Sequence, residues 1–296
     1  NTPQPLHIKK PSWLKSKIPT GKTYFQIKRS LKTQKLFTVC EEAKCPNIAE
    51  CWDKNTATFM ILGEQCTRAC RFCNVKTGNP QGYIDPKEPE NIALSCQKMH
   101  LSYVVITMVD RDDLQDGGSE HISKVIQQTR QHNPKIKIEL LAGDFNGSTT
   151  TLKTILTAGV EVFAHNLETV ERLSPRVRDR RASYRQSLKV LQTVKEIAPT
   201  KVYTKSSLML GLGETDEEIL TAMQELRAAN VDFLTLGQYM RPSKKHLTIK
   251  KWIPPTRFEE LAEEAKKLGF HNVAAGPLVR SSYKAREFFE QSQQTS

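Results

Sequence analysis

From residue 57 onward, short runs of β-branched and apolar residues alternate with longer amphipathic stretches. Such runs are typical of buried strands, and stretches of ten or more residues with a period of 3.6 are typical of helices. The six expected strands are 57–62, 103–109, 136–141, 160–165, 202–210 and 231–238. The expected helices are 89–99, 119–132, 149–158, 183–197, 215–230 and 256–268, and Thr215 with Glu218 predicts a capping box at the start of the fifth.

Six β/α units in one order predict a parallel sheet, which a right-handed winding would curl toward a full or partial barrel. We therefore expect the α/β class, with a partial (β/α)6 TIM-like barrel over residues 57–270. A basic, proline-rich arm and a cysteine-containing segment precede it over residues 1–56. A C-terminal extension follows over 271–296, and we expect its tail from Gln291 to be disordered.

In such a barrel the functional residues gather at the carboxyl ends of the strands, so the residues after each expected strand are candidates. Chemically useful side chains and glycines follow all six strands. They are Cys66, Cys70 and Cys73; Thr107, Asp110, Asp112, Asp116, Gly117 and Gly118; Asp144 and Asn146; His165, Asn166 and Glu168; Gly211 and Gly213; and Gln238, Tyr239 and Arg241.

Charge and cysteine content narrow the class of protein. Lysine and arginine total 44 against 32 acidic residues, and the net charge of +12 favours an acidic partner. The seven cysteines, with no secretory signal, indicate reduced thiols rather than a disulfide framework. No apolar run approaches the roughly 20 residues that span a bilayer, so we expect no membrane partner. The expected location is cytoplasmic, or organellar if a transit peptide has been removed.

Cys66, Cys70 and Cys73 lie within eight residues, directly after an expected strand. Three thiolates can hold three irons of a 4Fe-4S cluster and leave the fourth iron open. A small molecule with an amine and a carboxylate can chelate an open iron. Two alternatives remain at this point: a zinc site completed by one other ligand, or one helix face of buried thiols.

A second trio, Cys40, Cys45 and Cys51, also lacks a fourth cysteine nearby. Cys96 lies within an expected helix and is interpreted as an ordinary buried thiol. A cluster on this trio would therefore need some other atom as its fourth ligand. A structural zinc site or unrelated buried thiols are the alternatives.

Seven stretches of the chain resemble the lipoyl synthase family of the radical S-adenosylmethionine superfamily. They are CEEAKCPNIAECW (40–52), CTRACRFCNVKTG (66–78), TMVDRDDLQDGG (107–118), HNLETV (165–170), KSSLMLGLGET (205–215), GQYMRPSKKHL (237–247) and GPLVRSSY (276–283). The matches run from about residue 36 to 286. Many radical enzymes share the Cys66 trio, whereas few share the Cys40 trio or the RSSY motif.

The resemblance implies two 4Fe-4S clusters and assigns their ligands. Cys66, Cys70 and Cys73 would hold the cluster that reductively cleaves S-adenosylmethionine. The Cys40 trio would hold an auxiliary cluster whose fourth ligand is Ser282, rather than Ser281, with Arg280 beside it. The implied contacts to S-adenosylmethionine are Thr107, Gly117, Gly118, Asn166, Glu168, Arg180, Gln238 and Tyr239. Arg180 could contact a carboxylate or could belong to a solvated basic face, and the two glycines could simply form a turn.

The resemblance also implies a reaction and its partners. Two sulfur atoms would enter carbons 6 and 8 of an octanoyl chain amide-linked to a lysine of a carrier protein, by a radical route that consumes two S-adenosylmethionine molecules. The auxiliary cluster would be the sulfur donor. The implied partners are an octanoylated lipoyl carrier domain or a glycine cleavage H protein, a reduced ferredoxin or flavodoxin, and an iron-sulfur carrier for cluster repair. Lys9, Lys10, Lys15, Lys17, Lys244 and Lys245 are candidates for a basic rim that holds the carrier.

A zinc-stabilised nucleic-acid-binding module is the rival from another class, because it too would explain two cysteine trios and a basic charge. The β/α repeat pattern and the lack of interleaved aromatic and basic residues argue against it. We expect no nucleic-acid partner.

Overall fold

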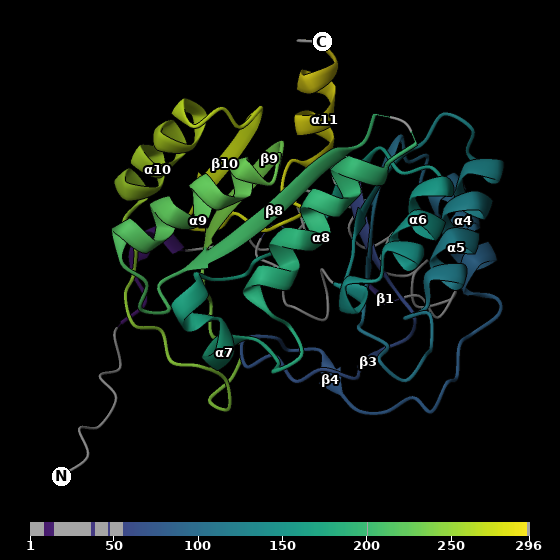
Figure 1. Cartoon of the computed structure of the whole chain (residues 1–296), viewed down its shortest axis with the longest axis horizontal. Coiled ribbons are helices and arrows are strands. Elements are labelled where there is room, and N and C mark those ends of the chain that lie inside the picture. The colour runs from purple at the N-terminus through teal and green to yellow at the C-terminus, as the bar shows by residue number, and fades with distance from the viewer. Residues whose placement is uncertain (1–8, 15–36, 39–46, 48–55, 200, 295–296) are drawn as a thin grey trace.

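The computed structural model describes residues 9–14, 37–38, 47, 56–199 and 201–294 (Figure 1). In these ranges a central sheet runs through parallel strands that are hydrogen-bonded in chain order. They are β2 (Thr56–Ile61), β5 (Tyr103–Met108), β6 (Lys137–Leu141), β7 (Val162–Ala164), β8 (Tyr203–Leu210), β9 (Phe233–Gln238) and β10 (Asn272–Gly276). The short strand β1 (Phe37–Thr38) adds antiparallel to β2.

Helices cover the outer face of this sheet (Figure 1). They are α4 (Glu88–Lys98), α5 (Ser119–His132), α6 (Thr149–Thr157), α8 (Tyr184–Ile197), α9 (Asp216–Ala228) and α10 (Pro255–Lys267). Shorter elements are η1 (Ser12–Leu14), η2 (Phe145–Gly147), η3 (Glu171–Leu173), α7 (Ser174–Val177), and the paired strands β3 (Gln65–Cys66) and β4 (Lys76–Thr77). No helix in the described ranges combines the length and apolarity needed to cross a membrane.

The six strands and six helices predicted from the sequence are all present, with ends within two residues of the expected ones. The capping box of Thr215 and Glu218 is confirmed. The sequence did not predict β10, because NVAAG is short and only half-buried. The prediction of a disordered tail from Gln291 is wrong for 291–294, since helix α11 (Ala285–Gln294) continues through them and buries Ser292.

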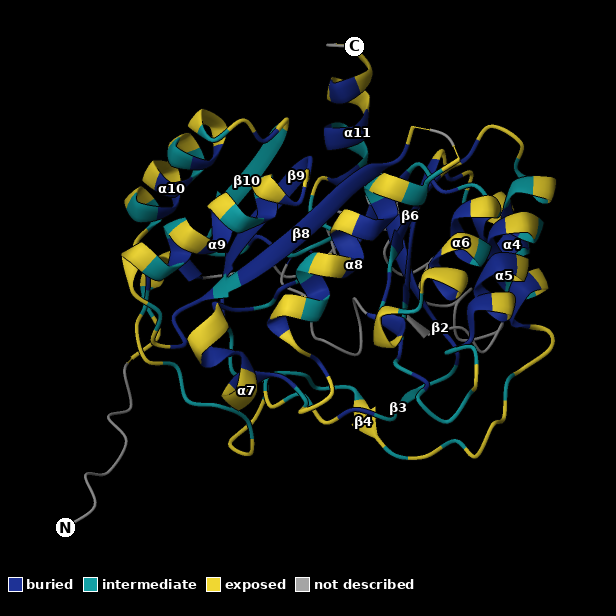
Figure 2. Cartoon of the chain, in the orientation of Figure 1, coloured by how far each residue is buried: buried dark blue, intermediate teal, exposed yellow. Residues whose placement is uncertain are grey.

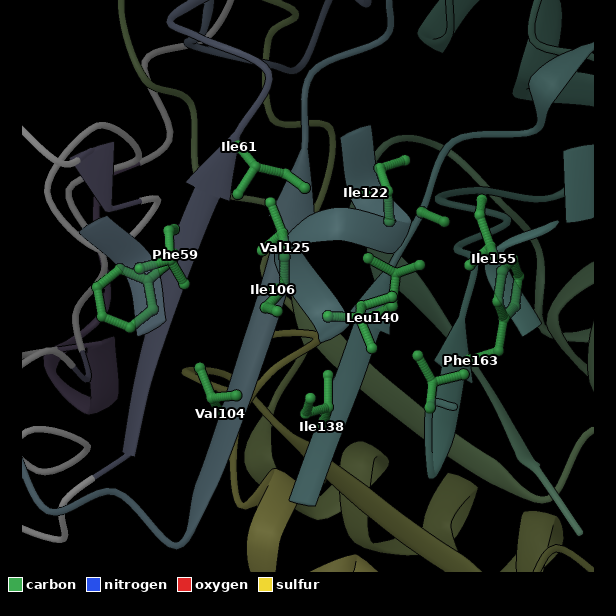
Figure 3. Packing of buried hydrophobic residues seen from close by; sticks show 14 of the residues in the cluster. Phe59, Ile61, Val104, Ile106, Ile122, Val125, Ile138, Leu140, Ile155 and Phe163 are labelled. Atoms are coloured by element: carbon green, nitrogen blue, oxygen red, sulfur yellow. The ribbon is translucent and has the colours of Figure 1, made fainter. Parts of the chain in front are cut away.

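The core between sheet and helices follows from the alternation of side chains along each strand. Every second residue of β2, β5 and β6 points outward to the helices. Figure 3 shows these side chains beside Ile122 and Val125 of α5 and Ile155 of α6. Helix surfaces are buried where they face the sheet and exposed where they face solvent (Figure 2). Cys96 is fully buried in this layer, which confirms its interpretation as an ordinary core thiol.

Helix α11 closes the amino end of the barrel, at the side of the molecule opposite β3 and β4 (Figure 1). Its Phe288 and Phe289 pack edge-on against Phe233 and Tyr203, with ring centroids 6.0 Å apart in both pairs. Aromatic pairs in this geometry add to the free energy of burial. The C-terminal helix therefore fills one end of the barrel and leaves the carboxyl ends of the strands for the site.

A buried ion pair lies inside the barrel beside this helix. Lys205 of β8 and Glu139 of β6 are each about 1% exposed, and the Lys205 ammonium donates to the Glu139 carboxylate at 2.8 Å. The Tyr103 hydroxyl donates to the other carboxylate oxygen at 2.8 Å. The pair joins two strands that are not neighbours in the sheet.

We expect Lys205→Met to lower the free energy of unfolding by about 3–5 kcal/mol, because it leaves the Glu139 carboxylate buried without its cation. The double variant Lys205→Met with Glu139→Leu removes both charges and should lose much less. Denaturant unfolding of both proteins measures the difference. Equal losses in the single and double variants would contradict this account of the pair.

Candidate active site

A cavity of about 550 Å³ opens at the carboxyl ends of the strands. Its wall contains most of the site residues that the sequence singled out. They are Cys66, Cys70, Cys73, Thr107, Asn166, Glu168, Gln238, Tyr239, Arg280, Ser281 and Ser282. The parallel strands explain the gathering, because their carboxyl ends all meet at one edge of the sheet.

The cysteine loop begins at the small β3–β4 sheet, where the amide of Gly78 donates to the carbonyl of Cys66 at 3.0 Å. A Cβ atom on Gly78 would lie 2.9 Å from Oε1 at the end of the flexible Gln65 side chain. Cys66, Cys70 and Cys73 are half-buried free thiols.

Arg68, between the first two cysteines, ties this loop to two others. Its guanidinium is buried and forms paired hydrogen bonds with the Asp144 carboxylate at 2.8 and 2.9 Å. It also donates to both oxygens of Asp112, at 2.9 and 3.1 Å, and lies 3.7 Å from Asp110. Because these acids follow β5 and β6, one cation holds the cysteine loop against the ends of both strands.

Other bonds hold the same loop from the far side of the cavity. The Asp179 carboxylate accepts from the amide of Ala69 at 2.8 Å, and the Asp179 amide donates to the Cys70 sulfur at 3.3 Å. The imidazole of His246 lies 2.9 Å from the carbonyl oxygen of Cys73. The cysteines are thus positioned by segments that follow several different strands.

Burial raises the pKa of the Cys66 thiol to about 11 and that of Cys70 to about 12, and it raises the pKa of Cys73 as well. Without a metal these groups are neutral thiols at neutral pH. Iron binding must therefore release their protons, as is general for thiolate ligands.

The donor set fits a cluster on these three residues. In a 4Fe-4S cluster each thiolate binds its own iron, so the sulfurs need to surround a space and need not converge on one point. Within the described part of the chain, no three His, Cys, Asp or Glu side chains converge to hold a single metal ion. The three cysteines nevertheless share one cavity wall, which suits the larger group.

Asn166 and Glu168 form a second part of the cavity wall, which suits a polar ligand. Asn166 Nδ2 donates to the Glu168 carboxylate at 3.1 Å, while the buried Asn166 Oδ1 has no partner among the described residues. Glu168 has φ +67°, a left-handed conformation that is costly for a residue with a side chain. Its backbone is held there by bonds to Ser207 and Met209 of β8. A buried polar atom without a partner and a strained backbone, both on a cavity wall, are typical of a ligand site.

The other lining residues differ in how far their polar atoms are already hydrogen-bonded within the protein. Thr107, the residue before the last in β5, lines the cavity. The Gln238 amide is already used, because Nε2 donates to three backbone carbonyls and Oε1 accepts from the Ile253 amide. The Tyr239 hydroxyl donates to the Leu247 carbonyl at 3.0 Å. Gln238 and Tyr239 thus fasten the loop after β9.

Three expected contacts lie off the wall. Gly117 and Gly118 do not line the cavity; both have positive φ, and a Cβ atom on Gly118 would lie 2.7 Å from Leu62. Arg180 is exposed and also does not line it. Their roles toward S-adenosylmethionine stay predictions. The Cys40, Cys45 and Cys51 trio lies outside the described residues.

The RSSY segment reaches the wall by crossing the end of β9. The carbonyl of Val279 lies so close to Gly237 that no Cβ atom would fit there. Arg280 donates to the Val279 carbonyl at 2.7 Å, and the Tyr283 amide closes a turn onto the Arg280 carbonyl at 2.9 Å. Both serine side chains of this turn line the cavity.

Sequence reasoning missed Arg178 as a site residue. This guanidinium is 6% exposed and lies on the cavity wall. No sequence feature of the run RVRDRR (176–181) distinguishes Arg178 from its basic neighbours. Only its place at the end of α7, directly after the buried Val177, turns it inward.

The fold and the cysteine loop define the class of protein. The family model of the radical SAM superfamily matches residues 60–226, and the chain belongs to that superfamily. Members of the class use an iron-sulfur cluster and S-adenosylmethionine.

Within it, the chain belongs to the lipoyl synthase family. The model of the N-terminal domain of lipoyl synthase matches residues 2–45. The chain is 54% identical to the mitochondrial lipoyl synthase of Schizosaccharomyces pombe, over 96% of this chain and 78% of that protein. It is 52% identical to the lipoyl synthase of Thermus thermophilus, over 98% of this chain and 90% of that protein. The predicted family is confirmed.

Solved structures confirm the partial barrel. The FeFe-hydrogenase maturase of Carboxydothermus hydrogenoformans superposes with a TM-score of 0.58 at 11% identity, over 91% of this chain and 78% of that chain. Methylornithine synthase superposes with a TM-score of 0.52 at 13% identity, over 86% and 78%. At these identities the likeness concerns the fold alone.

We expect Arg68→Lys to release iron from the Cys66 loop, because one ammonium cannot form the two paired contacts of a guanidinium and leaves buried carboxylates unpaired. Arg71→Lys, in the same loop but exposed, is the matched control and should keep its iron. Iron and labile sulfide are measured after anaerobic purification. Equal retention in the two variants would show that Arg68 does not hold the loop.

Proposed function

We propose that this chain inserts two sulfur atoms at carbons 6 and 8 of an octanoyl chain that is amide-linked to a lysine of a lipoyl carrier protein. Cys66, Cys70 and Cys73 would hold one 4Fe-4S cluster. Cys40, Cys45, Cys51 and Ser282 would hold a second one, which donates the sulfur. The bound groups would supply an electron, a hydrogen-abstracting radical derived from S-adenosylmethionine, and sulfide.

One observation carries the proposal: the Cys66 trio and the RSSY turn line the same cavity. A reaction that needs a radical from one group and sulfur from another requires both beside one substrate. The rest of the wall is rich in apolar side chains suited to an alkyl chain, including Leu14, Met60, Phe72, Met108, Leu141 and Met209.

Asn47 supports a place for the second trio at the same cavity. Its buried side-chain amide donates to the Leu278 carbonyl at 2.6 Å, and Leu278 lines the cavity four residues before Ser282. Asn47 follows Cys45 by two residues, a span of at most about 7 Å of chain. Asn47, two residues after the proposed ligand Cys45, thus contacts a residue four positions before the proposed ligand Ser282.

The chain's own residues would perform the positioning. The apolar wall would hold the octanoyl chain and keep water from the reacting carbons. Asn166, with its free Oδ1, and Glu168 would bind the polar groups of S-adenosylmethionine. An acid or a base cannot activate an unactivated C–H bond. Selectivity between carbons must therefore come from how the protein positions the octanoyl chain.

The carrier would dock on basic residues around the mouth. Lys244 and Lys245 are exposed on the segment that His246 fastens to Cys73, and Lys10 is exposed at the cavity edge. Lys9 is exposed nearby in sequence, whereas Lys15 and Lys17 lie outside the described residues. We further propose a reduced ferredoxin or flavodoxin as electron donor and an iron-sulfur carrier for repair. Cytoplasmic and organellar settings both fit, since the relatives include mitochondrial and bacterial proteins.

Cysteine variants should separate the two trios. We expect Cys66→Ala to stop cleavage of S-adenosylmethionine, because the cluster that supplies the electron loses a ligand. Cys45→Ala should still release 5′-deoxyadenosine but add no sulfur to the substrate. Nucleoside release is followed by chromatography, and an octanoylated carrier domain is weighed by mass spectrometry after anaerobic incubation. The parent protein should add two sulfurs and remove two hydrogens; an unchanged carrier mass would refute the proposed function.

The two serines of the RSSY turn can be compared directly. Both serines line the cavity, so both are available as ligands. We expect Ser282→Ala to lose about half of the roughly eight irons of two clusters, while Ser281→Ala keeps them. The reverse pattern in iron and sulfide analysis would assign the ligand to Ser281.

A further inference from the structure

The inner side of the cysteine loop faces the cavity, while its outer side faces solvent. Cys66, Cys70 and Cys73 line the cavity, whereas Ala69 and Arg71, on either side of Cys70, are exposed and do not line it. A single stretch of chain therefore separates the cavity from solvent at this point. A protein seated on the outer side would lie within one or two residues of Cys70.

The segment after η3 runs along this outer side and brings basic residues to it. The Arg71 amide donates to the Val177 carbonyl at 2.9 Å, and Arg71 Nη1 donates to the Arg176 carbonyl at 3.4 Å. Arg181 Nη2 donates to the Thr67 carbonyl at 2.6 Å. These bonds gather a set of exposed guanidinium groups, which we name the arginine patch: Arg71, Arg176, Arg180 and Arg181.

The two acids within the arginine patch are already paired. Asp179 lies 2.8 Å from Arg181 and accepts from the Ala69 amide at 2.8 Å, and its side chain is only 8% exposed. Asp112 pairs with Arg181 at 3.2 Å and also with the buried Arg68, and its side chain is 16% exposed. Four arginines against two largely covered carboxylates leave a positively charged surface over the cysteine loop.

We propose that the arginine patch docks an acidic one-electron carrier protein, which reduces the cluster that the Cys66 loop would hold. The proposal rests on the proposed function and assigns a surface to its electron donor. The reduced carrier protein loses one electron and the cluster gains it, and no atom is exchanged between the two proteins.

The position of the arginine patch favours an electron carrier over the lipoyl carrier. The lipoyl carrier must pass its lysine arm into the cavity, so it needs to dock around the cavity edge, where Lys10 is exposed. Arg71, Arg176 and Arg180 do not line the cavity. An electron needs no open path into the cavity. A small charged surface also suits the weak, short-lived encounters of electron-transfer proteins.

The first test measures the binding of two acidic one-electron carriers, a plant-type ferredoxin and a flavodoxin, by calorimetry on anaerobic, cluster-loaded protein. We expect Arg71→Glu with Arg176→Glu to raise the Kd by about tenfold or more, because each reversal turns an attraction into a repulsion. Added salt should weaken the parent's binding and reduce the difference between parent and variant.

The matched control is Lys124→Glu with Lys153→Glu, which changes the net charge by the same amount on exposed positions of α5 and α6. It should change the Kd by less than about threefold, because salt screens charges that lie far from the docking surface. Iron and labile sulfide should match the parent in both double variants, since all four side chains are exposed.

The second test compares reductants in the release of 5′-deoxyadenosine. With reduced ferredoxin or flavodoxin, the Arg71→Glu and Arg176→Glu double variant should show a raised KM for the carrier protein, and a high carrier concentration should restore the rate. With dithionite and methyl viologen instead, its rate should equal that of the parent, because a small reductant needs no docking surface.

Several outcomes overturn the proposal. If the parent binds neither probe, or if the arginine and lysine double variants weaken binding equally, the arginine patch is not the docking surface. If the arginine variant instead raises the KM for the octanoylated carrier under dithionite and leaves probe binding unchanged, the patch docks the lipoyl carrier. A parent that releases no 5′-deoxyadenosine with any reductant refutes the proposed function, while the binding test still decides what the patch docks.

Discussion

The site depends on one buried charge. Arg68 lies inside the cysteine loop, and its guanidinium pairs with Asp112 and Asp144, which follow two different strands. Three thiols on a loop could occupy many arrangements, and a cluster accepts few of them. The ion pairs select one arrangement, because any movement of the loop would leave a carboxylate or the guanidinium buried and unpaired. The geometry of the proposed cluster ligands is thus set by residues that are not among them.

The barrel makes this arrangement possible by separating its two ends. At the amino end, the aromatic side chains of α11 and the Lys205–Glu139 pair fill the interior. At the carboxyl end the interior stays open, and the loops after β5, β6, β7 and β9 converge on the cysteine loop. A rigid, filled base allows the opposite end to carry strained and unsatisfied groups such as Glu168, Asn166 and Arg178.

Much of this was predictable from the sequence because it is local. Helix and strand periodicity, and the capping box of Thr215 and Glu218, depend on neighbours within a few residues. The cysteine spacing and the motifs around it are local as well. The prediction that the residues after the strands share one mouth followed from parallel topology alone, and it held for Thr107, Asn166 and Glu168. Other residues of that prediction do not line the cavity, because their positions depend on how each loop packs: Asp112, Asp116, Gly117, Gly118, Asn146, Gly211, Gly213 and Arg241.

The sequence by itself determined the β/α order, the family and the chemical character of the proposed ligands, since each depends on residue type and spacing. Tertiary structure decided which of the four arginines in RVRDRR faces the cavity. It also decided that the Gln238 side-chain amide forms hydrogen bonds with the backbone, and that Asn47 contacts the segment before RSSY. The physical reason is the same in each case. Burial and pairing of a polar group depend on partners tens to hundreds of residues away, and no local pattern records which partner a buried charge will find.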